Sequence, residues 1–163
     1  MKQITKEIKK YKLTDETIEY YGFTLHRIQA LVDFSDVKAG DLGGWVEEED
    51  NLSQSGDAWV YDNAKVFGGA KIYDNAKVRS HVWIGDKAKV YDSAKVDDDA
   101  VVGGYAKVFG NAMVSGNAMV SGNAKVYGIA SVFGNAEIGN NAQVFGTIKV
   151  FGDAEDGGNA SVH

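Results

Sequence analysis

The chain has 163 residues, a formal net charge of −6, and no cysteine or proline. The lack of cysteine excludes disulfide bonds and thiolate metal sites, and no apolar run reaches the roughly 20 residues that a membrane-spanning helix needs. We therefore expect a cytoplasmic protein without a membrane partner.

Residues 1–57 carry most of the negative charge and predict a small β-rich segment. They contain twelve Asp and Glu against seven Lys and Arg, with an acidic run at 47–50 that we interpret as a solvated loop rather than a surface for a basic partner. Residues 17–21 and 23–28, separated by a glycine, predict a β-hairpin. The glycine-rich stretch 37–46 predicts a loop that leads to Trp45 and another strand.

From residue 58 to residue 162 the sequence repeats every six residues without an insertion or deletion. Each unit places alanine and then valine or isoleucine two positions apart, so both side chains point to the same side of a short strand. A Gly-Asn, Asp-Asn or Gly-Gly pair follows, which suits the positive φ angle of a tight corner. Val82 and Ile148 replace the alanine, and Asp156 replaces the branched residue. A six-residue period does not keep one face of a helix, so it predicts short strands stacked on one another.

This pattern resembles the hexapeptide-repeat proteins, which form a left-handed parallel β-helix. The sequences Ile-Gly-Asp-Lys-Ala-Lys at 84–89 and Ile-Gly-Asn-Asn-Ala-Gln at 138–143 match the Ile-Gly-x-x-Ala-x form of that family. The resemblance implies that three hexads close one triangular coil, and hence an all-β fold with about six coils over residues 58–163. An open end of such a coil exposes unpaired backbone groups, so we interpret residues 1–57 as its N-terminal cap.

The layout as a whole is similar to uncharacterised hexapeptide-repeat proteins of bacteria and their phages. The segment Gly-Asp-Leu-Gly-Gly-Trp-Val-Glu at 40–47, directly before the repeats, contributes to this likeness. Some of those proteins are named as acyltransferases on fold analogy, which is a weak argument for function.

One face of the predicted coil carries two columns of residues spaced 18 apart. The lysine column is Lys71, Lys89, Lys107 and Lys125, and the aromatic column beside it is Tyr73, Tyr91, Phe109 and Tyr127, with Phe145 after it. Stacked rings and packed lysine stems stabilise such a face even without a partner. As a binding surface it suits a protein, a planar ligand or a polyanion. Nucleic acid is the less favoured partner, because the chain is acidic overall.

A second face carries exposed apolar residues beside glycines. Trp83, Val101 and Met119 alternate there with small residues, which suits close approach by another surface. We predict self-association through this face, into a dimer or into the trimer that the resemblance implies. Docking of residues 1–57 onto it is the alternative.

The third face carries no uniform column, and its most charged feature is the corner Asp97-Asp98-Asp99. Carboxylates suit hard cations, but adjacent residues of a strand do not all point the same way. We therefore interpret this corner as a solvated turn and predict no metal site.

The resemblance also implies an alternative function, that of an acyl-CoA-dependent acyltransferase with a histidine as general base. His81 is the candidate, because we interpret His26 as structural and His163 is the last residue. Two features oppose this alternative: no loop interrupts the hexads, and no helix follows them.

We therefore favour a non-catalytic binding protein without a cofactor, whose partner-binding residues are the lysine and aromatic columns. The resemblance to phage proteins implies a more specific form, an accessory protein that binds and blocks a host factor such as a defence component. Acyl-CoA is the expected cofactor only under the acyltransferase alternative.

Overall fold

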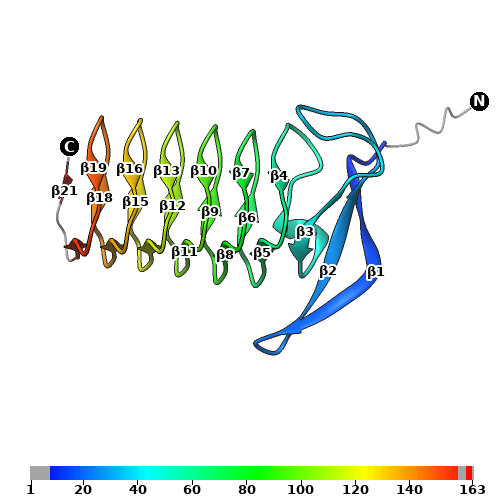
Figure 1. Cartoon of the computed structure of the whole chain (residues 1–163), viewed down its shortest axis with the longest axis horizontal. Coiled ribbons are helices and arrows are strands. Elements are labelled where there is room, and N and C mark those ends of the chain that lie inside the picture. Colours follow the sequence, from blue (N-terminus) through cyan, green and yellow to red (C-terminus); the bar gives the residue numbers. More distant parts are fainter. Residues whose placement is uncertain (1–7, 158–160, 163) are drawn as a thin grey trace, which may run out of the picture.

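The computed structural model of the chain describes residues 8–157, 161 and 162. Its regular structure there consists of strands and one short 3-10 helix, η1 (Glu49–Asn51). Figure 1 shows the coils stacked along the long axis, with β1 and β2 at the N-terminal end. The predicted fold class, a left-handed parallel β-helix of about six coils with a small β-rich cap, is confirmed.

The strands form three sheets, one for each side of the coil. The first, which we call the cap face, has nine strands: β1 (Tyr11–Tyr20), β2 (Phe23–Ala30), β3 (Leu42–Val46), β5 (Lys65–Val66), β8 (Trp83–Ile84), β11 (Val101–Val102), β14 (Met119–Val120), β17 (Glu137–Ile138) and β20 (Glu155–Asp156). The second, the ladder face, has six: β6 (Lys71–Ile72), β9 (Lys89–Val90), β12 (Lys107–Val108), β15 (Lys125–Val126), β18 (Gln143–Val144) and β21 (Ser161–Val162). The third face also has six: β4 (Trp59–Val60), β7 (Lys77–Val78), β10 (Lys95–Val96), β13 (Met113–Val114), β16 (Ser131–Val132) and β19 (Lys149–Val150).

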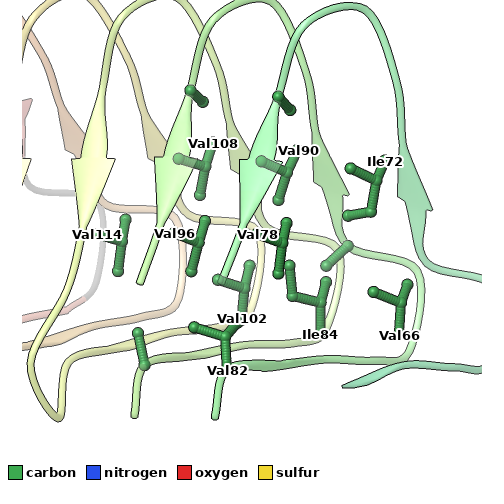
Figure 2. Close-up of a cluster of buried hydrophobic side chains, with 14 of the residues drawn as sticks. Val66, Ile72, Val78, Val82, Ile84, Val90, Val96, Val102, Val108 and Val114 are labelled. Carbon is green, nitrogen blue, oxygen red and sulfur yellow. The ribbon is translucent and has the colours of Figure 1, made fainter. Parts of the chain in front are cut away.

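The repeated alanine and valine or isoleucine positions build the core. Every one of them from Ala58 to Val144 is buried, including Val82 in an alanine position. Figure 2 shows such side chains, for example Val90, Val102 and Val96, converging from the three sheets. Burial of one valine side chain stabilises the fold by roughly 1.5–3 kcal/mol. The core is thin in each coil, but it is continuous from coil to coil, so these contributions add along the axis.

Backbone hydrogen bonds join each coil to the next. The amide of Lys65 donates to the Val82 carbonyl at 2.9 Å, and the amide of Phe67 donates to the Ile84 carbonyl at 3.0 Å. The corners need positive φ angles, and at Gly104 (φ +61°) a Cβ would lie 2.8 Å from the backbone of Gly122. Glycine at this corner therefore allows the next coil to approach closely.

The N-terminal cap continues the sheet of the cap face. The predicted hairpin is confirmed: β1 and β2 pair antiparallel, β2 pairs with β3, and β3 pairs parallel with β5. The sequence predicted a loop that continues as far as Trp45, whereas strand β3 already begins at Leu42. The reason is close packing, since a Cβ at Gly43 would lie 2.6 Å from the Val60 carbonyl oxygen.

Two buried polar side chains fasten the cap to the end of the coil. The Lys10 ammonium donates to the carbonyls of Ala58 at 2.7 Å and Gly56 at 3.3 Å. The Tyr11 hydroxyl donates to the Leu52 carbonyl at 2.5 Å, and the Glu49 carbonyl oxygen lies 2.8 Å from the same hydroxyl. These bonds satisfy carbonyl groups at the end of the core. Burial lowers the pKa of Lys10 to about 8, despite the opposing charge of Asp57, and burial also raises the pKa of Tyr11.

We predict that the free energy of unfolding rises between about pH 8 and pH 10 and falls above pH 10. In the first interval the unfolded chain still holds the Lys10 proton that the folded protein has released, so deprotonation favours folding. Above pH 10 the tyrosines ionise in the unfolded chain, whereas buried Tyr11 resists ionisation. Urea unfolding from pH 7 to pH 11 measures both slopes. Lys10→Met should flatten the rise and the exposed control Lys12→Met should keep it; an unchanged rise in Lys10→Met would contradict the assignment.

Candidate functional site

The aromatic column on the ladder face forms one continuous stack of rings. The ring centroids are 4.8 Å apart for Tyr73–Tyr91, 5.0 Å for Tyr91–Phe109, 4.9 Å for Phe109–Tyr127 and 5.1 Å for Tyr127–Phe145. The rings are parallel within 8° throughout. In-register parallel pairing of the strands sets this spacing, because residues 18 apart lie directly over one another. The predicted stacking of this column is confirmed.

The lysine column stands beside the rings in the same register. Lys71 pairs with Lys89, Lys89 with Lys107, and Lys107 with Lys125 across adjacent strands. Lys71 is exposed and the other three are half-buried. Within the described part of the chain, none of the four forms a salt bridge. Four ammonium groups one strand apart therefore give this face a strip of positive potential.

The two ends of this strip differ in charge. At the corner beside the rings, Asp74 and Asp92 occupy the early coils, where Asp92 accepts a hydrogen bond from the Gly110 amide at 3.0 Å. Glycines 110, 128 and 146 take the same corner position in the later coils. Burial is the main cause that raises the pKa of Tyr91, and the neighbouring carboxylates of Asp92 and Asp74 raise it further. The positive potential is therefore least opposed around Lys107 and Lys125.

The hairpin covers the first part of the cap face. The Trp83 ring stacks on Phe67 at 6.0 Å and on Tyr21 at 6.3 Å, and it meets the edge of Tyr20 at 6.5 Å. The alternative prediction, that the N-terminal segment docks on this face, is therefore confirmed for the hairpin at these coils. Sequence reasoning missed these hairpin rings, although Ile18 and Tyr20 alternate on one side of β1 and so signal an apolar face.

Self-association through Trp83, Val101 and Met119 stays a prediction. Trp83 is half-buried beneath the hairpin, whereas Val101 and Met119 lie in the next two coils, and Met119 is 41% exposed. The part of the face that is open to a second copy is thus centred on Met119.

His81 lies at an exposed corner. Its Nδ1 is 3.6 Å from Asp99 Oδ1, and the side chain is 67% exposed. This separation is longer than a hydrogen bond, so Asp99 does not fix the orientation of the ring. His26 Nδ1 lies 3.1 Å from the Thr14 carbonyl oxygen inside the hairpin, and His163 lies outside the described residues.

Across residues 8–157, 161 and 162, no three His, Asp or Glu side chains gather as a metal site requires. In the same part of the chain, no helix is long and apolar enough to cross a membrane.

Comparison with known proteins shows a partial likeness. No family model matches the chain. The chain is similar to the uncharacterized acetyltransferase YdcK of Escherichia coli (strain K12), with 36% identity over 63 residues. The match covers 34% of this chain and 19% of the relative, so the chain spans only a small part of that protein. The stacked parallel coils and this relative both fit the hexapeptide-repeat proteins.

The ring stack should contribute measurably to stability. Tyr91→Ala removes two stacked contacts at 4.8 and 5.0 Å and should lower the free energy of unfolding by about 1–3 kcal/mol. Tyr105→Ala is the control, because that ring is 59% exposed at a corner outside the stack, and it should change stability by less than about 0.5 kcal/mol. Chemical denaturation measures both values, and equal small losses would show that stacking contributes little.

Proposed function

We propose that this chain is a non-catalytic binding protein that presents its ladder face to an acidic surface of a partner protein. The observation that carries the proposal is the lysine column, whose four ammonium groups form no salt bridge among the described residues. Unpaired charges of one sign attract a partner of the opposite sign and fix its orientation.

The rings beside the lysines support the same proposal. Tyrosines and phenylalanines offer a large contact area, and stacking restricts their motion before a partner arrives. A prepared surface loses less conformational entropy on binding than a mobile one does. We place the centre of the contact at Lys107 and Lys125 with Phe109 and Tyr127, since Asp74 and Asp92 weaken the positive potential of the earlier coils.

A more specific form of the proposal concerns the biological role. A phage-type accessory protein that blocks a host factor, such as a defence component, would need a rigid surface that occupies the acidic site of its target. A flat face on an uninterrupted coil meets that need without an active site of its own. The support for this role is the resemblance in sequence layout.

Reversal of charge in the lysine column should abolish partner binding. Lys107→Glu with Lys125→Glu should lose a protein that the wild type retains at stoichiometric amounts from a lysate of its host. Lys95→Glu with Lys149→Glu is the matched control, because it changes the net charge equally on the third face, where both lysines are exposed. Mass spectrometry of the retained proteins compares the three samples.

Two results would overturn this proposal. One is equal retention of the same protein by both double variants, since the ladder face would then be irrelevant to binding. The other is loss of all retained material after nuclease treatment, which would make the partner a nucleic acid. Retention should also weaken as salt is added, because the contact is electrostatic.

A second candidate is an acyl-CoA-dependent acyltransferase with His81 as general base, and the name of the E. coli relative favours it. The residues around His81 do not fit the anionic phosphates of coenzyme A. Asp97, Asp98 and Asp99 lie in the next coil at the same corner, and Arg79 is directed to Asp36 at 3.8 Å. We therefore assign no catalytic step to this site.

Coenzyme A separates the two candidates. A ligand that binds only the folded state must raise the melting temperature. A binding protein without an acyl-CoA site should therefore show no change in melting temperature when coenzyme A is added. A rise that is lost in His81→Ala, and kept in the hairpin variant His26→Ala, would favour the acyltransferase instead. Thermal denaturation of the full chain measures this shift.

A further inference from the structure

The ring stack on the ladder face has an open end toward the N-terminal cap. Within the described part of the chain, the Tyr73 ring stacks on Tyr91 alone. One coil earlier, Leu52 forms a parallel bridge with Ile72, and the Ser53 amide donates to the Ile72 carbonyl at 2.9 Å. Ser53 thus occupies the position in the column where the later coils carry a ring. Its short side chain leaves one face of Tyr73 without a stacking partner.

A cavity of about 380 Å³ lies at this open end. Its walls include Tyr73, Ser53, Lys71, Gln54, Glu49 and Asp50. A volume of this size is at the lower end of the range for small-molecule sites in proteins. The cavity therefore has room for a ring in the place where the column lacks one.

Hydrogen bonds hold the floor of the cavity in place. The Gln54 amide donates to Glu49 Oε1 at 2.9 Å and to the Tyr11 carbonyl at 3.1 Å, and its oxygen accepts from the Lys10 amide at 2.8 Å. Glu49 also pairs with Lys9 at 3.0 Å. A ligand thus meets a site that is already formed, which reduces the entropy that binding must offset.

Two charged groups on the wall have their hydrogen-bonding capacity free. Among the described residues, neither the Asp50 carboxylate nor the Lys71 ammonium forms a hydrogen bond or a salt bridge. The Asp50 carboxylate can only accept hydrogen bonds, and the Lys71 ammonium can only donate them. Together they suit a flat edge that carries both a donor and an acceptor.

We propose that this cavity binds an uncharged, amino-substituted heteroaromatic ring, such as the base of a nucleoside, which stacks on Tyr73 as the next ring of the column. An exocyclic amino group would donate to Asp50, and a ring nitrogen or carbonyl would accept from Lys71. The Asp50 carboxylate, whose charge no salt bridge offsets, opposes a phosphate group, so the site favours a nucleoside over a nucleotide. This site lies at the opposite end of the strip from Lys107 and Lys125 and does not depend on the proposed partner.

Adenosine is the probe for the test, titrated into the full chain and followed by saturation-transfer NMR. The wild type should show saturable binding, and adenosine monophosphate should bind more weakly than adenosine. Tyr73→Ala should weaken adenosine binding at least about tenfold, because stacking on an aromatic side chain supplies much of the affinity for a base. Phe133→Leu is the matched control, because it removes a ring from the separate stacked pair Phe133–Phe151 of the third face, and it should bind adenosine as the wild type does.

Ser53→Phe is the decisive variant, because it places a ring of the protein itself in the empty position. It should abolish adenosine binding and raise the melting temperature, a combination that a damaged fold would not produce. Absence of saturable binding by the wild type would overturn the proposal. So would undiminished binding by Ser53→Phe, or tighter binding of adenosine monophosphate than of adenosine.

Discussion

The coil depends on one constraint: the backbone of each strand finds its hydrogen-bond partners one full coil away. The amide of Lys107 donates to the Ala124 carbonyl, and the same offset continues along all three faces. Buried backbone groups cannot remain unpaired, so no residue can move without disturbing the coils above and below it. The interior is correspondingly thin, because only an alanine and a branched residue from each strand face inward.

Because of this constraint, the residue type at an outward position determines the chemistry of a whole column on the surface. Each outward position is repeated at the strand spacing, so a lysine in one coil becomes a column when the next coils repeat it. The corners show the same logic, because Asp86 accepts a hydrogen bond from the Gly104 amide at 2.8 Å, across one coil. On this fold, outward residues of successive coils therefore form columns that run parallel to the axis.

The repeating part was predicted well, because the six-residue period fixes which side chains face inward, and the resemblance to hexapeptide-repeat proteins implies three hexads in each coil. The buried Ala and Val positions and the stack from Tyr73 to Phe145 follow from a period of six and a coil of eighteen. The non-repeating part was harder. Contacts between Trp83 and the hairpin join residues with no periodic relation, and pairing to the coil already begins at Trp45. The open position at Ser53 was also missed. Val60 follows Leu52 by eight positions and not by six, which hides the six-residue spacing from Val46 to Leu52.

The three-sided coil also limits how such a chain can change its length during evolution. Duplication or loss of eighteen residues would add or remove a whole coil and leave every column on its own face. Duplication of a single hexad would instead move all later residues to the next face, and the lysines after that point would continue the row of Lys95. The uninterrupted ladder from Lys71 to Lys125 is therefore the pattern that growth by complete coils would leave.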